Sequence, residues 1–213
     1  MTRKPFPIDR RAWPIAFILA GVIAAAFLFH FNALGGFLLI VAAGHLAFFR
    51  DPERPAPPGE GLLSPADGTV VDIDIRPENR YLQQESVRIG IFMSVFVPHV
   101  NRSPMKGEVC YLHYVPGKFL NAFKREASEL NESHWMGIEQ GTKKMLVRQV
   151  AGLIARRIRC DARQGQRLER GERFGIICYS SRVEIFIPKD SFRPTVRCGD
   201  RVKAGQTLLG EWT

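Results

Sequence analysis

The sequence predicts an α+β fold that is mainly β: an antiparallel, barrel-sandwich-like domain behind an N-terminal transmembrane helical hairpin. Three observations support this. A long apolar run occupies the first 50 residues, a Pro-rich stretch follows it, and short strand-like runs separated by Gly, Pro and Asp fill the remainder. With 213 residues, 46% hydrophobic and 24% charged, the chain can form one sizeable core beyond the N-terminal segment.

The apolar run covers residues 15–49, where only two histidines and one asparagine are clearly polar. A straight helix of this length would measure roughly 52 Å, well beyond the roughly 30 Å hydrocarbon core of a bilayer. Two helices, Ile15–Phe29 and Ala33–Phe49, turning around His30, Phe31 and Asn32, would place both basic flanks on one side. We therefore expect a cell-membrane anchor with the folded domain facing the cytoplasm. A cleaved signal peptide is the alternative, but the run is too long and lacks a convincing Ala-x-Ala site.

These features divide the chain into residues 1–50 (basic N-terminus and hairpin), 51–61 (Pro-rich linker) and 62–213 (folded domain). Within the last part, Phe119–Asn131 is the clearest helical candidate. The remaining elements are expected to be strands, at Gly68–Ile75, Ser86–Val97, Gly107–Tyr114, Lys144–Ile154, Phe174–Cys178, Arg182–Ile187 and Gln206–Leu209.

The net charge is +9, and the excess is concentrated between Lys143 and Arg173, where ten basic residues face three acidic ones. On a membrane-tethered protein such a segment favours anionic lipid as the partner. No helix-turn-helix, zinc-finger or RNP pattern supports nucleic acid. The four cysteines are widely spaced without a Cys-x-x-Cys pair, which predicts no metal site and reduced thiols.

Two segments of the folded part are alike: Ser64–Val71 near its start and Cys198–Leu208 near its end. Both resemble the barrel-sandwich modules of biotinyl and lipoyl carriers and of sugar-phosphotransferase domains. A carrier needs a lysine at an exposed hairpin tip, usually beside Met or Asp, and Lys203 lacks those neighbours. The similarity therefore predicts architecture and not carrier function.

A serine pair, Ser180 and Ser181, lies between two mainly apolar runs near the C-terminus. The hydroxyl of Ser181 can add to the carbonyl of Ser180 and convert the peptide to an ester, which can eliminate to dehydroalanine and hydrolyse to a pyruvoyl group. The alternative is a polar pair at a strand bend. Elsewhere, His99 follows an apolar strand, where a scaffold can hold a reactive imidazole, and Asp67 precedes a glycine in a predicted turn. Each of these two residues could instead be purely structural.

These residues belong to six short sequence blocks that follow one another in a fixed order. Together the six blocks indicate a function more specifically than any one of the residues does. In order they are Phe48–Arg54, Ser64–Gly68, His99–Pro104, Tyr114–Ala122, Gly152–Ile158 and Ser180–Val183. From Phe48 to the C-terminus the chain resembles the phosphatidylserine decarboxylase family, in particular its short, membrane-anchored bacterial and archaeal branch, which includes archaetidylserine decarboxylase-like members.

The resemblance implies a self-processed enzyme that converts phosphatidylserine to phosphatidylethanolamine and CO₂. Ser181 matches the serine that becomes the pyruvoyl group, Asp67 matches the aspartate of the processing triad, and His99 matches an active-site histidine. The carboxylate would orient the imidazole, which would remove the serine proton. Cleavage between residues 180 and 181 would give chains 1–180 and 181–213, held together by the sheet.

The implied cofactor is the pyruvoyl group derived from Ser181, with no metal and no pyridoxal phosphate. The substrate amine would form a Schiff base with its ketone, which then accepts electrons as CO₂ leaves. His99 is the first candidate for the proton donor and His113 a weaker one. Arg102, His113 and Lys118 are candidates for the substrate phosphate. The implied partners are phosphatidylserine, anionic membrane lipid and the cleaved C-terminal chain. A homodimer is an open alternative.

Three positions depart from the family pattern. Ser180 stands where the family commonly has Gly, Arg102 stands where some branches have a second histidine, and Ser133 ends the segment that reads Asn-Glu-Arg in the family. Two other functions therefore stay open. One is a membrane-bound serine hydrolase that uses Asp67, His99 and Ser181, although the chain lacks a Gly-x-Ser-x-Gly elbow. The other is a processing-dead paralogue that binds lipid.

Overall fold

The computed structural model describes residues 7–123, 125–153, 158–178 and 181–213. The chain forms two compact units, Met1–Glu53 and Arg54–Thr213. The prediction of a mainly β, antiparallel fold with apolar helix at its N-terminus is confirmed. The second unit begins at Arg54, within the segment that the sequence predicts to be a linker.

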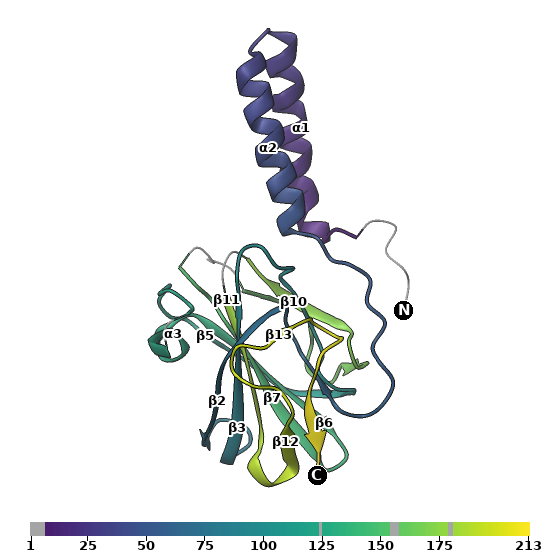
Figure 1. The fold of residues 1–213 in the computed structure, drawn as a ribbon, viewed down its shortest axis with the longest axis vertical. Helices are drawn as coiled ribbons and strands as arrows, with labels where there is room; N and C mark the ends of the chain where they lie inside the picture. Colours follow the sequence, from purple (N-terminus) through teal and green to yellow (C-terminus); the bar gives the residue numbers. More distant parts are fainter. Residues whose placement is uncertain (1–6, 124, 154–157, 179–180) are drawn as a thin grey trace. The chain divides into compact units, whose positions relative to one another are not determined.

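The first unit is a helical hairpin (Figure 1). A single 3₁₀ turn, η1 (Arg10–Ala12), leads into α1 (Trp13–Leu28), and α2 (Asn32–Phe48) returns antiparallel to it. Between the helices His30 adopts a φ of 60°, and the amide of Phe31 donates to the carbonyl of Ala26 at 2.8 Å. By length and composition the helix Arg10–Leu28 could cross a membrane, with a mean hydropathy of 1.9, and α2 is apolar but shorter.

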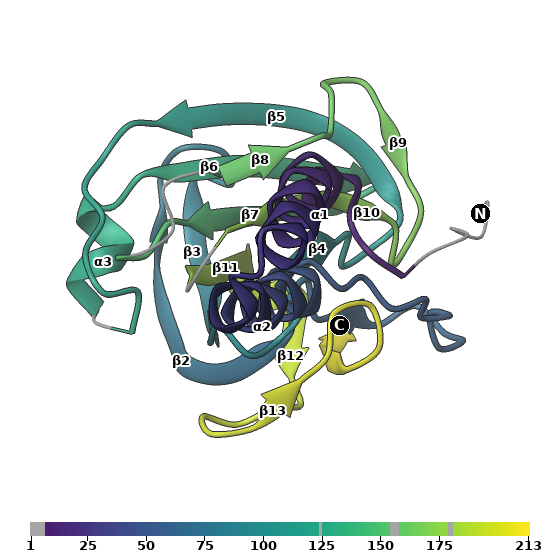
Figure 2. The ribbon, with the colours of Figure 1, turned by 90° about the horizontal axis from the view of Figure 1, so that it is seen from above.

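The second unit is built around an eight-stranded antiparallel sheet that curls into a half-barrel (Figure 2). The strand β11 lies near its centre and pairs with β3 on one side and β7 on the other. Its residues alternate between the two faces, with Val183, Ile185 and Ile187 in the main hydrophobic core. In spatial order the strands are β13 (Arg201–Val202), β2 (Gly68–Glu78), β3 (Gln84–Met93), β11 (Ser181–Pro188), β7 (Lys143–Val150), β6 (Ser133–Gln140), β5 (Gly107–Val115) and β9 (Arg167–Leu168).

Two three-stranded sheets complete the unit. One contains β1 (Leu62–Leu63), β14 (Leu208–Trp212) and β12 (Phe192–Pro194), the last preceded by the 3₁₀ turn η2 (Lys189–Ser191). The other contains β4 (Val100–Arg102), β10 (Arg173–Ile177) and β8 (Ile158–Cys160).

The two segments of similar sequence lie side by side. Val202 of β13 pairs with Gly68 of β2, and the amide of Ser64 donates to the carbonyl of Thr207 at 2.8 Å. The amide of Gly205 in turn donates to the carbonyl of Ser64 at 2.8 Å. The similarity therefore reflects how the first and last parts of the unit pair with each other.

The predicted helix Phe119–Asn131 is wrong in extent, since α3 covers only Arg125–Leu130. Asn131 explains the shortening because its side chain holds the preceding loop outside a helix. Its Oδ1 accepts from the amide of Leu120 at 2.8 Å, and its Nδ2 donates to the carbonyls of Leu120 and Ala151 at 2.8 and 2.7 Å. Among the strands, the sequence analysis missed β6 entirely, and β3 and β7 end at Met93 and Val150, earlier than predicted.

Candidate active site at the start of β11

Ser181 is the first residue of β11 and is fully buried. It lies opposite Met93, the last residue of β3, and its hydroxyl donates to the Met93 sulfur at 3.4 Å. The predicted cleavage partner Ser180 lies outside the described residues. The reactive serine of the sequence analysis thus sits at the end of a central strand, shielded from water.

Asn101 shares the same sulfur with Ser181. Its Nδ2 lies 3.8 Å from Met93 Sδ and 3.5 Å from the carbonyl of Pro65, and its Oδ1 accepts from Gln149 Nε2 at 2.8 Å. This buried amide pair places one donor, Asn101 Nδ2, near the sulfur that Ser181 also contacts, and sequence reasoning missed both residues. Asn101 could have been found, because it lies two residues after His99, where a short strand begins, and residues i and i+2 of extended chain face the same side.

His99 is fully buried immediately before β4. Its Nδ1 lies 2.7 Å from the carbonyl oxygen of Val97. Since a carbonyl oxygen only accepts, Nδ1 carries the hydrogen, and Nε2 is the basic nitrogen of the neutral ring. The backbone contact that fixes the ring's tautomer is the kind that orients catalytic and metal-binding histidines.

The backbone also brings His99 to the chain that leads into Ser181. The carbonyl of His99 accepts from the amide of Ile177 at 3.4 Å, and Val100 pairs with Ile176. The strand β10 ends at Ile177 and β11 begins at Ser181, four residues later. Even a fully extended chain of this length places the Cα atoms of Ile177 and Ser181 at most about 14 Å apart. The predicted scissile bond therefore belongs to a short connection that starts beside His99.

Asp67 is bound by Arg54, a residue of the Pro-rich stretch. The guanidinium contacts both carboxylate oxygens, Nη1 to Oδ2 at 2.6 Å and Nη2 to Oδ1 at 2.8 Å, and the amide of Ala204 lies 3.4 Å from Oδ2. Both side chains are largely buried. The next residue, Gly68, needs to be glycine because a Cβ there would collide with the carbonyl of Phe92.

The predicted triad therefore has separate described partners: Asp67 contacts Arg54, and the His99 Nδ1 contacts the Val97 carbonyl. Sequence reasoning missed Arg54 as a member of the site. The only available signal was that this arginine belongs to the Phe48–Arg54 block of the family resemblance.

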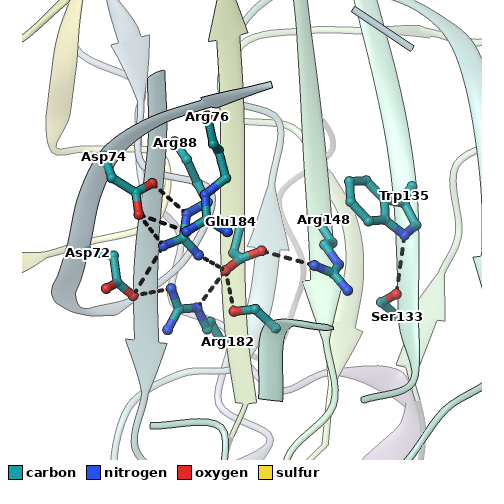
Figure 3. A network of polar contacts seen from close by, with 10 residues as sticks. Asp72, Asp74, Arg76, Arg88, Ser133, Trp135, Arg148, Arg182 and Glu184 are labelled. Carbon is teal, nitrogen blue, oxygen red and sulfur yellow. Dashed lines mark hydrogen bonds and ion pairs between the residues drawn. The ribbon is translucent and has the colours of Figure 1, made fainter. Parts of the chain in front are cut away.

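The opposite face of β11 carries a buried ion network (Figure 3). Glu184 lies at its centre, fully buried, with Oε1 accepting from Arg88 Nη1 at 2.8 Å and from Arg182 Nε at 2.8 Å. The hydroxyl of Ser128 donates to the same oxygen at 2.6 Å, and Arg148 Nη1 lies 3.4 Å from Oε2. Arg182, which directly follows Ser181, is thus held by Glu184.

Two further carboxylates balance the arginines. Asp72 binds Arg182, and Asp74 accepts two bonds from Arg88 at 2.8 and 2.7 Å. Gly90 on β3 makes room for this packing, because a Cβ at that position would collide with the guanidinium of Arg182. The network therefore ties the start of β11 to its neighbour β3 and, one strand further, to β2.

The charges of the network shift the pKa values of its acids downward. The bond from Arg88 is the main cause that lowers the pKa of Asp74 to about 2. For Glu184, burial by itself would raise the pKa, but Arg182, Arg148 and Arg88 together hold it below its usual value. Both carboxylates are consequently ionised at neutral pH, as their contacts with arginine require.

The three candidates for substrate phosphate occupy different places. Arg102 is buried, with Nη1 donating to the carbonyl of Gly171 at 3.2 Å and its side chain against Gly205, so it supports two turns of the fold. His113 is exposed on β5, with its ring beside Tyr111. Lys118 is exposed in the loop that follows β5, where its amide donates to the carbonyl of Leu130. Of the three, His113 and Lys118 have exposed side chains, and Arg102 is buried.

Among the described residues of the basic segment 143–173, several basic side chains have partners within the second unit. Arg148 is buried in the network, and Arg170 donates to the carbonyls of Gly61 and Pro57 at 2.8 and 2.6 Å. Lys143 pairs with Glu60 at 2.8 Å. Arg148 therefore stabilises the interior of the unit, and Arg170 and Lys143 fasten residues 57–61 to it.

Comparison with known proteins decides the family. The sequence profile described as phosphatidylserine decarboxylase matches residues 42–210, which include Asp67, His99 and Ser181. The chain belongs to the phosphatidylserine decarboxylase family. It is 45% identical to the phosphatidylserine decarboxylase proenzyme of Symbiobacterium thermophilum over 210 residues, covering 98% of this chain and 96% of the relative. The corresponding proenzyme of Geotalea uraniireducens is 39% identical over 212 residues, covering 99% of both chains.

The names of these relatives describe proenzymes, and this bears on Ser181 at the start of β11. A relative from Carboxydothermus hydrogenoformans, 44% identical over 164 residues and covering 76% of this chain and 77% of the relative, is also named a proenzyme. The phosphatidylserine decarboxylase resemblance predicted from the six blocks is confirmed.

Proposed function

We propose that this phosphatidylserine decarboxylase family member releases CO₂ from phosphatidylserine to form phosphatidylethanolamine, after cleaving itself between Ser180 and Ser181. The single observation that carries the proposal is the position of Ser181. It is buried at the head of a central strand, four residues beyond the backbone contact between Ile177 and His99. The relatives' names, which describe decarboxylase proenzymes, support the same assignment.

In the first stage the Ser181 hydroxyl loses its proton and its oxygen bonds to the carbonyl carbon of Ser180. His99 is the proposed base, because the Val97 carbonyl holds the hydrogen on Nδ1, which makes Nε2 the nitrogen of the neutral ring that can accept a proton. The C–N bond then breaks as the proton taken by His99 passes to the nitrogen, which leaves an ester and a free amine on residue 181. Loss of the Cα proton of residue 181 then expels the Ser180 carboxylate from Cβ, which frees the new C-terminus at Ser180 and leaves dehydroalanine. The imine tautomer of dehydroalanine takes up water and releases ammonia to give the pyruvoyl group. Asp67, held by Arg54, is the proposed third member, fixing the turn before β2.

The fold would keep the new chain 181–213 in place. It contributes β11, which pairs with β3 over eight residues and with β7 over five. It also contributes β13, which pairs with β2. Its strand β14 pairs with β1 on one side and with its own strand β12 on the other. The buried contacts of Arg182 with Glu184 and Asp72 would hold the new N-terminus where the serine now lies.

The residues around Ser181 fit a pyruvoyl group at that position. The site is buried, and the Asn101 amide beside Met93 offers a hydrogen-bond donor next to the serine Oγ. Such a group supplies a ketone that accepts electrons as the substrate carboxylate leaves. The role of His99 would then be to return a proton, while burial excludes water from the reacting atoms.

The substrate is a membrane lipid, and we propose that the hairpin anchors the chain in the cell membrane with the second unit in the cytoplasm. The apolar helix Arg10–Leu28 supports membrane association. Lys118 and His113 are the proposed contacts of the phosphate, because both side chains are exposed.

The test is decarboxylation by the full chain in vesicles that contain phosphatidylserine, with formation of phosphatidylethanolamine as the readout. We expect the wild-type chain to form it and Ser181→Ala to stay uncut and inactive. A chain that stays uncut but releases fatty acid or free headgroup would instead support the serine hydrolase. A chain that stays uncut and inactive would support the lipid-binding paralogue.

A further inference from the structure

Four loops leave the second unit at the same end of the sheet as Ser181. The register shows this directly: Met93 at the end of β3 pairs with Ser181, and Val150 at the end of β7 pairs with both Arg182 and Ser133. Because the strands are antiparallel, the segments that follow β3 and β7 and those that precede β11 and β6 all lie at one end. This is the end at which the lipid headgroup must arrive.

Three of the most exposed large apolar side chains of the second unit lie on these loops. Phe96, which follows β3, is 84% exposed; Phe123, which precedes α3, is 62% exposed; and Leu153, which follows β7, is 63% exposed. We call these three side chains the apolar rim. The ring of Phe123 packs edge-on against the ring of Phe92, with 5.4 Å between the two ring centroids, so this part of the rim is fixed to the end of β3. Exposed aromatic side chains gathered at one end of a domain mark an interaction surface.

We propose that the apolar rim inserts into the interface of an anionic bilayer and so brings the headgroup layer to Ser181. The proposal rests on the proposed function, because it assigns the route by which a bilayer lipid reaches that site. Aromatic side chains favour the bilayer interface, where apolar rings sit among the headgroups.

Charge on the same loops favours an anionic bilayer over a second protein. The sequence of the loops 116–132 and 151–157 contains five basic residues against three acidic ones, of which Lys124, Arg156 and Arg157 lie outside the described residues. The described Lys118 and, on the adjoining β8, Arg159 are exposed. Basic residues beside an apolar insertion attract anionic lipid and add to its binding. A second copy of the chain would instead have to bring a complementary acidic and apolar surface to the same loops.

The direct test uses a fluorescent side chain as a depth probe. Phe96→Trp in the full chain, reconstituted in vesicles that contain phosphatidylserine and lipid brominated on its acyl chains, is expected to lose fluorescence by contact with bromine. Ile75→Trp is the matched control, because Ile75 is 52% exposed but pairs with Val87, six residues or about 20 Å along β3 from Met93. Both variants share the three native tryptophans, so their difference reports the new side chain alone.

We expect bromine to quench Phe96→Trp well beyond Ile75→Trp. Equal quenching of the two variants would overturn the proposal. So would a Phe96→Trp signal that is insensitive to bromine but shifts with dimer formation in cross-linking, because the rim would then cover a second copy. Neither readout depends on catalysis, so a failed function and a failed docking surface give different results.

A second readout separates lipid access from chemistry. The triple variant Phe96→Ser, Phe123→Ser, Leu153→Ser is expected to lose about tenfold or more of its activity on bilayer phosphatidylserine, since each side chain loses its apolar burial. Its self-cleavage and its activity on dispersed short-chain phosphatidylserine are expected to match those of Ile75→Ser. Equal activity of the triple variant and Ile75→Ser on bilayers would contradict the proposal. Loss of self-cleavage in the triple variant would contradict it too, because the rim would then serve the fold.

Discussion

Substitution of Glu184 by Gln tests the ion network in which Arg182, the residue after the reactive serine, is fixed. The change keeps the size of the side chain and removes its charge. The variant then has one carboxylate fewer in a region closed to solvent. The three arginines that contact Glu184 lose its negative charge; they are Arg88, Arg182 and Arg148. Arg88 and Arg182 keep Asp74 and Asp72, whereas Arg148 keeps the ring of Trp135, 4.4 Å from its guanidinium carbon.

The cost follows from the burial of the carboxylate. Removal of one partner from a buried ion pair costs about 3–5 kcal/mol, because the other charge is left without compensation. The amide oxygen of Gln can still accept hydrogen bonds from the arginines and from Ser128, so we expect the lower end, about 3 kcal/mol. For a unit of this size that corresponds to a fall in Tm of roughly 6 to 12 °C.

The assay is thermal unfolding of the full chain in detergent, with Glu211→Gln as the matched control. Glu211 is exposed and lies 3.9 Å from Arg193, an exposed pair of the kind that contributes at most about 1 kcal/mol. We expect Glu184→Gln to unfold far below Glu211→Gln and to self-cleave more slowly, because Arg182 loses the charge of one of its two carboxylate partners. A Glu184→Gln protein within about 0.5 kcal/mol of the control would refute this reasoning.

Three other substitutions test separate contacts. Arg54→Lys is expected to slow the appearance of the 181–213 chain on gels, because an ammonium cannot hold both oxygens of Asp67; cleavage at the rate of Arg193→Lys would show that this contact does not serve maturation. Gly90→Ala is expected to displace Arg182, and so to lower both the Tm and the rate of self-cleavage; an unchanged protein would mean that the guanidinium moves aside without cost. Asp74→Asn is expected to flatten the acid-unfolding curve. Its folded pKa of about 2 lies below the ordinary 3.8, so the stability it adds is full above pH 3.8 and is lost as the pH falls toward 2; equal slopes for wild type and Asp74→Asn in that range would contradict the assignment.

The sequence predicted those parts of the fold that local patterns determine. The helical hairpin followed from the length of the apolar run, and the half-barrel from short alternating strands between turns. The extent of α3 could not be predicted, because it depends on hydrogen bonds from Asn131 to Leu120 and Ala151, residues 11 and 20 positions away. Tertiary contacts of this kind override local helix propensity.

In the candidate site, too, local sequence patterns could be interpreted from the sequence, whereas contacts between distant residues could not. Ser181 and His99 were predicted as site residues because their residue types and neighbours fit a known chemistry, and these assignments stay predictions. Arg54, Asn101 and Glu184 were missed because each acts through a partner that is distant in sequence: Asp67, Gln149 and Arg88 respectively. In the case of Glu184 a signal was present, since Arg182 and Glu184 interrupt the apolar residues of a central strand, where buried charges must be paired.

The most direct test of the central claim is the intact mass of the full chain purified in detergent, with Ser181→Ala measured in parallel. Self-cleavage predicts two chains, of which the smaller runs from residue 181 to residue 213 and is blocked at its N-terminus by pyruvoyl. The Ser181→Ala chain should remain whole. A wild-type chain that also remains whole would contradict the account, because burial of Ser181 beside Met93 would then serve the fold alone.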